Sequence, residues 1–90
     1  MHTDIRDVER IIKALANARR LSIIKFLSNR KQASVGQAAE HIKLSFKSTS
    51  NHLLIMAAAD ILERKQTSTT VLYSLRIPVS QLVKSISSIL

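Results

Sequence analysis

The sequence predicts a mainly helical α+β domain with one small β-hairpin, in the order helix, helix, helix, helix, strand, strand, helix. Three observations support this prediction. Apolar residues recur every three or four positions along most of the chain, which is the period of an α-helix. Val71, Tyr73 and Leu75 occupy alternate positions in a segment rich in Thr and Val, which is typical of a strand. One Gly and one Pro in 90 residues disfavour a fold with many β-turns.

Length and composition limit the classes of protein. We treat residues 1–90 as one domain, since this length suits a single modest core. The chain has no Cys, which excludes disulfide scaffolds, zinc fingers and thiol catalysis. Neither a signal peptide nor a membrane-spanning apolar run is visible, so we expect a cytoplasmic protein that does not insert into membranes.

The charge balance indicates a polyanionic partner. Fourteen Lys and Arg residues stand against six Asp and Glu, which gives a net charge of +8 at pH 7. A small domain this basic is typical of nucleic-acid binding and also suits an anionic membrane surface. The alternative is a charge that serves only solubility or a ribosome-like scaffold. We favour nucleic acid.

Two helices are predicted in the N-terminal part, over residues 4–16 and 18–28. Thr3 is a suitable N-cap for the first helix, and acidic residues follow in its first turn, where the helix dipole favours them. Asn17 separates the two helices. Both segments carry apolar residues at helical spacing.

Arg19 and Arg20 fall in the first turn of the second predicted helix. The positive end of the helix dipole disfavours cations there, so a bound anion such as a DNA phosphate would explain both residues. For Arg20 the alternative is an internal salt bridge, with Glu40 as a candidate partner.

The next two helices are predicted to form a compact pair. Residues 34–37 have the form of a capping box, S-x-x-Q, at the start of a short helix over 35–42. Ser45 is a suitable N-cap for a helix over 46–59. That helix begins polar and ends apolar, so its rear can be anchored in a core while its front extends into a groove.

A hairpin and a last helix complete the chain. Two strands flank a Ser/Thr-rich tip at 67–70, and the second strand ends near Arg76. Pro78 suits the start of a helix over 79–89, because its fixed backbone angle fits a first helical turn.

A short helix, a three-residue turn and a polar-fronted second helix form a helix-turn-helix, and a basic hairpin after it makes a winged helix. The front of the second helix is expected to enter the major groove. Lys47 and Asn51 lie four residues apart on one face, where Lys can donate to guanine and Asn can pair with adenine. The predicted DNA contacts are Ser45, Phe46, Lys47, Ser48, Ser50, Asn51, Arg64, Lys65, Thr67, Arg19 and Arg20.

Each of these assignments has a plainer alternative. The polar front would otherwise be an ordinary solvated helix start. Phe46 would contact a thymine methyl group or pack under the wing. Arg64 and Lys65 would meet phosphates or the minor groove, or would only protect a β-edge from aggregation.

Four segments resemble the arsenical-resistance-repressor (ArsR) family of regulators. They are residues 14–24 (ALANARRLSII), 34–40 (SVGQAAE), 44–53 (LSFKSTSNHL) and 73–75 (YSL). The resemblance extends over about residues 5–76. It implies a winged helix-turn-helix regulator that binds double-stranded DNA as a homodimer, with a palindromic operator as the expected site and repression as the expected effect.

The resemblance also implies that the first and last helices form the dimer interface. The expected interface residues are Ile5, Val8, Ile12, Leu82, Val83, Ile86 and Ile89. A domain of this size cannot easily cover both terminal apolar stripes by itself, which agrees with this assignment. The alternative is that both stripes belong to the chain's own core.

Metal-sensing sites known in the family have no counterpart here. Ser34 and Gly36 stand where one such site has two Cys residues, and residues 79–89 contain neither His nor acid. The three His residues lack metal-ligand spacing, and His52 is expected to be a packed structural residue. We therefore expect no cofactor and no metal, and the sequence indicates no particular small-molecule effector.

Three other functions are less well supported by the sequence than DNA-binding regulation. One is a winged helix that binds another protein or coats DNA without sequence preference. Another is binding to a membrane surface through residues 79–90. Lys84 is the only basic residue in this segment, so its attraction to anionic lipids would be weak. An enzyme is the least favoured, because no nucleophile–base pair, metal cluster or phosphate loop is present.

Overall fold

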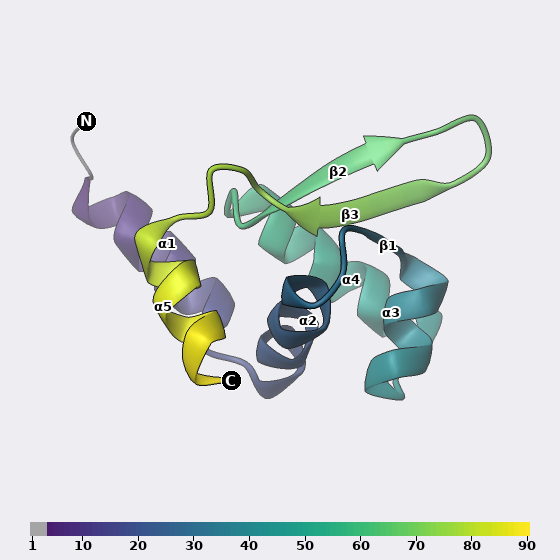
Figure 1. Cartoon of the computed structure of the whole chain (residues 1–90), viewed down its shortest axis with the longest axis horizontal. Helices are drawn as coiled ribbons and strands as arrows, with labels where there is room; N and C mark the ends of the chain where they lie inside the picture. Colours follow the sequence, from purple (N-terminus) through teal and green to yellow (C-terminus); the bar gives the residue numbers. More distant parts are fainter. Residues whose placement is uncertain (1–3) are drawn as a thin grey trace.

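Figure 1 shows the computed structural model of the chain, in which residues 4–90 are described. The predicted mainly helical α+β winged helix-turn-helix is confirmed. In chain order the elements are α1 (Ile5–Leu15), α2 (Ala18–Ser28), β1 (Ala33–Ser34), α3 (Val35–Ile42), α4 (Phe46–Ala58), β2 (Leu62–Gln66), β3 (Val71–Leu75) and α5 (Gln81–Ile89).

The sheet has one strand more than the sequence predicts. Its order is β1–β3–β2 and both pairings are antiparallel. The additional strand β1 has only two residues, Ala33 opposite Tyr73 and Ser34 opposite Leu72. A strand this short has no periodicity to detect, and tertiary pairing alone defines it. Strand β1 thus connects the helix-turn-helix to the hairpin of β2 and β3. We call this hairpin, residues 62–75, the wing.

Polar side chains cap the helices of the helix-turn-helix as predicted. Ser34 and Gln37 form the reciprocal capping box at the start of α3. The hydroxyl of Ser45 accepts a hydrogen bond from the Ser48 backbone N–H at 3.1 Å, which satisfies one of the free donors at the start of α4. The start of α4 is therefore fixed by local hydrogen bonds.

The two terminal helices begin differently from the prediction. Asp4 caps α1 by accepting from the Arg6 N–H, whereas the predicted cap, Thr3, lies outside the described residues. Helix α5 starts at Gln81 with Ser80 as its N-cap, so Pro78 precedes the helix instead of starting it. A Ser side chain that accepts from the third backbone N–H overrides the weaker helix-start preference of Pro.

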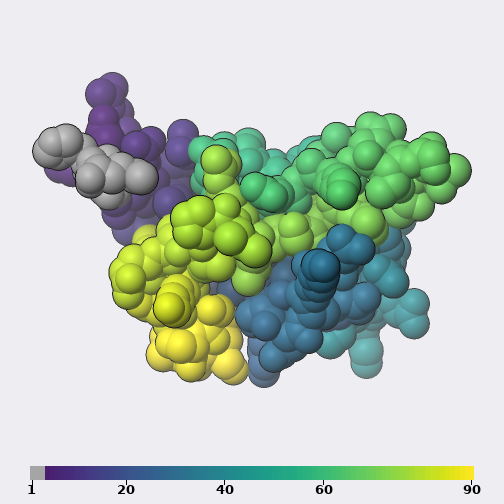
Figure 2. Space-filling model, turned by 45° about the horizontal axis from the view of Figure 1, so that its top comes forward, coloured from purple at the N-terminus to yellow at the C-terminus, as the bar shows by residue number. Residues whose placement is uncertain are grey.

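The core lies where α2, α4, α5 and the sheet meet. Among the most deeply buried side chains are Ile23 and Ile24 of α2, Leu53 and Met56 of α4 and Val83 of α5. Figures 1 and 2 show both terminal helices at one end of the molecule and the wing tip projecting at the other. No helix in residues 4–90 is long and apolar enough to cross a membrane.

Candidate nucleic-acid interface

The front of α4, which we define as residues 45–51, is exposed as the sequence predicts. Lys47, Ser48 and Asn51 lie at the surface, and Ser50 is half-buried toward the wing. Thr49, between Ser48 and Ser50, is fully buried and anchors this part of the helix in the protein interior. Its hydroxyl has no hydrogen-bond partner within residues 4–90. One side of the front is thus held in the protein while the other side is free.

Lys47 and Asn51 share the exposed side of α4. Their spacing of four residues places them one turn apart. Helix α4 contains no acidic residue, so nothing along it repels a polyanion. The exposed donors of Lys47 and Asn51, with the free backbone N–H groups at the start of α4, form a set that suits phosphate oxygens and base edges.

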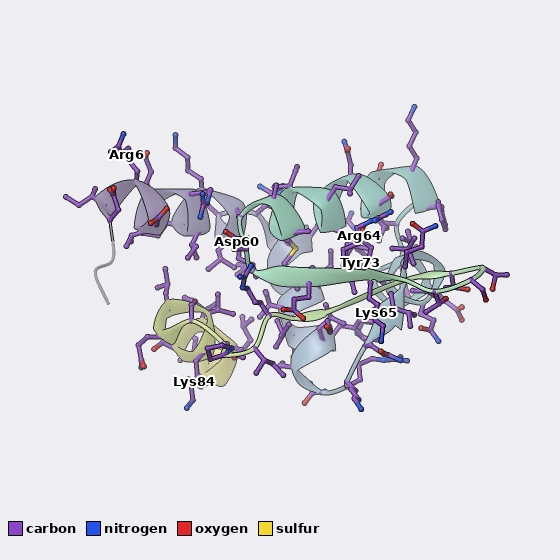
Figure 3. All side chains as sticks on the ribbon, turned by 90° about the horizontal axis from the view of Figure 1, so that it is seen from above. Arg6, Asp60, Arg64, Lys65, Tyr73 and Lys84 are labelled. Atoms are coloured by element: carbon purple, nitrogen blue, oxygen red, sulfur yellow. The ribbon has the colours of Figure 1, made fainter. Side chains whose placement is uncertain are left out.

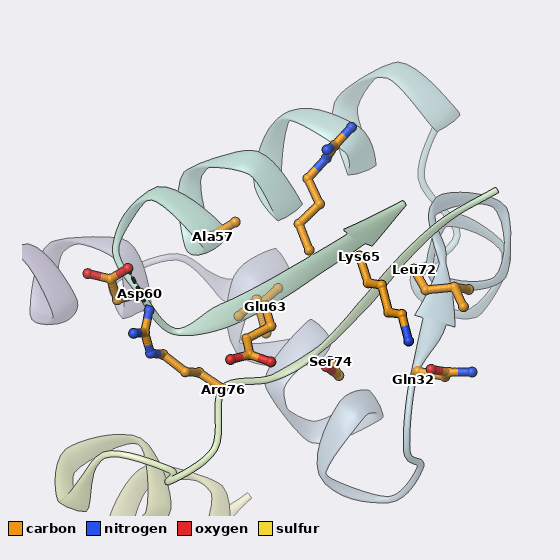
Figure 4. A pocket seen from close by; sticks show the side chains of 10 residues that line it. Gln32, Ala57, Asp60, Glu63, Lys65, Leu72, Ser74 and Arg76 are labelled. Carbon is orange, nitrogen blue, oxygen red and sulfur yellow. Dashed lines mark hydrogen bonds and ion pairs between the residues drawn. The ribbon is translucent and has the colours of Figure 1, made fainter. Parts of the chain in front are cut away.

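The two cations of the wing lie on opposite faces of the sheet. Arg64 pairs with the buried Tyr73 across the wing and extends toward α4 (Figure 3). Lys65, the next residue along β2, extends to the other face, as successive strand residues do (Figure 4). Only Arg64 is therefore placed beside the front of α4.

An open groove separates α4 from the wing. Its volume is about 560 Å³, and Arg64 is the only charged side chain among the described residues that line it. Helix α4 contributes Phe46, Ser50 and Leu54, which are spaced by four residues on the side facing the wing. We call this feature the α4–wing groove. The remaining lining residues are Ser34, Val35, Gly36, Thr69, Thr70, Val71 and Tyr73.

Thr67 forms the turn at the wing tip. Its hydroxyl donates to the Thr70 carbonyl at 2.8 Å and accepts from the Thr70 N–H at 3.2 Å. The Thr67 N–H also donates to the Thr70 carbonyl. Because the hydroxyl is used in closing the turn, we do not assign Thr67 a DNA contact.

Arg20 is an internal connector and not a free phosphate clamp. Its guanidinium donates to the Ala14 carbonyl and, at 3.2 Å, to His52 Nδ1, so it joins the end of α1 to α4. The internal partner is therefore a carbonyl and a histidine, and not the expected Glu40. Asn17 caps the helix by accepting from the N–H groups of Arg19 and Arg20, so the helix start needs no bound anion.

Arg19 is exposed but also has an internal contact. Its guanidinium donates to the Ile42 carbonyl at the end of α3, at 3.1 Å. That carbonyl is one of the last in the helix and lacks an intrahelical partner. Arg19 thus stabilises the turn before α4, and its remaining donors stay available at the surface.

His52 is the packed structural residue that the sequence suggests. Burial is the main cause that lowers its pKa below the ordinary value of 6.5, and the nearby charges of Arg20 and Arg19 lower that pKa further. Nδ1 faces a guanidinium donor, which requires the neutral ring. His52 therefore belongs to the support of α4.

Asp60 joins three elements at the rear of α4. Its φ of 61° places it in the left-handed region, which Asp tolerates better than most residues. Its carboxylate contacts Arg76 at 2.9 Å (Figure 4) and Arg10 of α1 at 3.2 Å. These exposed ion pairs connect the wing base and α1 to the end of α4. The partners of Asp60 lie far from it in the chain, so sequence patterns do not reveal them.

The predicted interface residues of α1 divide into exposed and half-buried positions. Ile5 is 84% exposed and Ile12 is 51% exposed, while Val8 is half-buried. Single exposed apolar residues are common on protein surfaces, but two β-branched side chains on one short helix leave a considerable apolar area in water.

Helix α5 contributes more to the chain's own core than predicted. Val83 is 2% exposed and belongs to that core, so we exclude it from the expected interface. Leu82 and Ile86 are half-buried and pack against the same core. Ile89 is 78% exposed, and Leu90 follows it at the surface. Only the end of α5 is left without cover.

No three His, Asp or Glu side chains within residues 4–90 gather closely enough to hold a metal ion. His41 instead stacks on Phe26, with the ring centroids 4.3 Å apart, and Arg30 lies over the same ring. This stack joins α3 to α2 and lies apart from the α4–wing groove.

The fold and the exposed basic front of α4 define a winged helix-turn-helix protein of the DNA-binding class. The model of the arsR family of bacterial regulatory proteins matches residues 17–64, more than half of the chain. The chain therefore belongs to the ArsR family, and it is a DNA-binding transcription regulator and not an enzyme.

Solved structures agree with this family. The chain is similar to HlyU from Vibrio cholerae N16961, with 28% identity over 99% of this chain and 92% of that one and a TM-score of 0.80. It is similar to the transcriptional repressor PagR of Bacillus anthracis, with 26% identity, 94% and 93% coverage and a TM-score of 0.80. A homodimeric winged helix-turn-helix domain from Mycobacterium bovis shares the fold at 22% identity, 94% and 76% coverage and a TM-score of 0.82. No curated protein matches the chain in sequence.

Proposed function

We propose that this protein is a homodimeric repressor that recognises a palindromic site in double-stranded DNA. One observation carries the proposal. The acid-free front of α4 presents Lys47 and Asn51 on one exposed side, next to a groove that contains Arg64. In this arrangement Lys47 and Asn51 read base edges in the major groove, and Arg64 holds the phosphate strand beside it. A protein bound across a promoter blocks the polymerase, and this role places the protein in the cytoplasm.

The homodimer rests on the apolar end of the molecule. Ile5, Ile12 and Ile89 leave large apolar side chains in water, and a second copy of the chain would cover them. In such a dimer the two α4 fronts meet successive major grooves on one side of the duplex, so the half-sites lie about one helical turn apart. The homodimeric domain from Mycobacterium bovis is consistent with this proposal.

The test is a selection from random double-stranded DNA at several salt concentrations. We expect an enriched palindrome, and a log affinity that falls with log salt by about 0.9 per neutralised phosphate. Lys47→Ala and Asn51→Ala are each expected to lower discrimination between the enriched site and random DNA by about 1–3 kcal/mol. Lys25→Ala is a matched control, because Lys25 is an exposed cation at the end of α2. Equal losses on both DNAs would contradict base reading.

A second function is favoured by the apolar residues on α4. Phe46, Leu54 and Ile55 are exposed there on more than one side of the helix, and such exposed apolar side chains suit a protein-interaction module or an architectural DNA-binding protein. This second candidate predicts DNA binding without an enriched sequence, so the same selection separates the two.

A further inference from the structure

Phe46 is an aromatic residue with no place in the core. Of the three aromatic residues in the chain, Phe26 and Tyr73 are buried, whereas Phe46 is 64% exposed. It is the first residue of α4, directly after the capping Ser45. Its ring borders the α4–wing groove without filling it. Most of the ring is therefore exposed and not packed under the wing.

The surroundings of Phe46 are cationic and hydrogen-bonding. Lys47 follows it, and Ser50 and Arg64 line the same groove. Charges of one sign disfavour a second copy of the same surface and favour a polyanion. If DNA occupies this surface, the ring meets the edges of bases, because it lies at the end of α4 that enters the groove.

The chemistry of the major groove leaves one partner for an apolar ring. Guanine and adenine present mainly hydrogen-bond donors and acceptors on that edge, cytosine adds a C5–H, and thymine alone carries a methyl group, at C5. A phenyl ring set beside donors or acceptors would desolvate them without replacing their hydrogen bonds, at a cost in free energy. Contact with a methyl group instead removes apolar surface of both partners from water.

We propose that Phe46 is a specificity residue that selects thymine, through its methyl group, at one position of each half-site. The inference rests on the proposed function, since it concerns the same DNA-facing surface. It assigns to Phe46 a base preference distinct from those of Lys47 and Asn51. The same contact accepts 5-methylcytosine, which carries its methyl group at the equivalent place.

The first experiment compares the sites that the wild-type protein and Phe46→Ala select from random double-stranded DNA. The wild type is expected to enrich a thymine that the variant no longer enriches, while the other positions of the motif stay the same. Lys47→Ala is the matched control and is expected to lose a different position. A motif that is identical for the wild type and Phe46→Ala overturns the inference.

The second experiment isolates the methyl group. At the position that Phe46 controls, thymine is replaced by uracil, cytosine or 5-methylcytosine in a synthetic duplex, and affinity is measured at fixed salt. The wild type is expected to lose about three- to fivefold with uracil, the effect of one buried methyl group, and to gain a similar factor from cytosine to 5-methylcytosine. Phe46→Ala is expected to show neither difference. Equal binding of thymine and uracil by the wild type overturns the inference.

These outcomes separate the inference from the function on which it rests. A salt-dependent protein that enriches a palindrome but ignores the methyl group refutes only the role of Phe46. A protein that binds DNA without enriching any sequence refutes both the thymine contact and the sequence-specific regulator. Circular dichroism of Phe46→Ala checks that α4 is still folded, which is expected because the ring is mostly outside the core.

Discussion

The two ends of this molecule differ in the kind of side chain that they leave exposed to water. At the wing end, α3 and α4 begin with hydrogen-bonded caps, and Arg19 satisfies the Ile42 carbonyl between them. At the other end, α1 and α5 present Ile5, Ile12 and Ile89 to water. Helices α1 and α5 are capped as well, so the two ends differ in the side chains that they expose. The wing end leaves polar groups of the α4 front and the Phe46 ring free for a ligand. The other leaves apolar surface that only further burial would stabilise.

This difference separates stability from assembly. Anchoring of α4 by Leu53 and Met56 does not require a second chain, because both side chains are buried within the monomer. In the proposed homodimer, a second chain covers Ile5 and Ile89. We therefore expect changes in the α4 anchor to alter folding of each protomer, and changes at the apolar end to alter self-association.

The largest effect is expected at the α4 anchor. Leu53→Ala removes a side chain that is 1% exposed and leaves a cavity, so we expect a loss of about 2–5 kcal/mol in the free energy of unfolding. Leu54→Ala is the matched control, because Leu54 is the next residue along α4 and is 47% exposed. A change of about 0.5 kcal/mol is expected for it. Urea denaturation of both variants measures the difference. Similar losses would show that the two sides of α4 are equally supported.

The next effect concerns the apolar end. Ile12→Asp places a charge on the exposed side of α1, so we expect the dimer dissociation constant to rise by about 10–100-fold while each protomer stays folded. Sedimentation over a concentration series measures it, with circular dichroism as the check on folding. Leu54→Asp, an equal change on α4, is the control and should leave self-association unaltered. A wild-type protein that stays monomeric at high concentration would end the comparison of the two ends.

The helices could be predicted because their signals are local. The capping box at Ser34, the N-cap at Ser45 and the polar front of α4 are each contained within a few residues. Both β1 and the Arg20–His52 contact escaped prediction, because they join segments far apart in the chain. For the same reason the sequence left Arg20 between a phosphate and an internal partner. A cation in a first helical turn has the same local pattern whether its partner is an anion or a distant histidine.

Asp60 is where the two ends are connected, and a smaller effect is expected there. Asp60→Ala removes the ion pairs with Arg10 and Arg76 and leaves a side chain that disfavours a φ of 61°, so we expect a loss of about 1–2 kcal/mol in the free energy of unfolding. Asp60→Gly also removes the ion pairs but accepts that angle, and a smaller loss is expected. Thermal denaturation at low and high salt separates the two causes. Equal losses in Ala and Gly would assign the whole effect to the ion pairs.

The smallest effect is expected from a change of pH. It acts at the contact between Arg20 of α2 and His52 of α4. His52 has a lowered pKa in the folded protein, so below about pH 6.5 the unfolded chain binds a proton that the folded chain does not. Its contribution is therefore complete above pH 6.5 and is lost as the pH falls from 6.5 toward the folded-state value. Physically, a protonated ring would confront the Arg20 guanidinium at 3.2 Å.

Urea denaturation between pH 5 and pH 7.5 measures this loss, and His52→Gln is expected to flatten it. The matched control is His41→Gln, a change on α3 that leaves the Arg20–His52 contact untouched. DNA affinity measured over the same pH range adds a second observable. If His52 only holds α4 in place, the free energy of unfolding will decrease as the pH is lowered, while the bases selected by α4 stay the same. A change in the selected bases would make His52 part of the reading surface, and the separation between anchor and front along α4 would no longer hold.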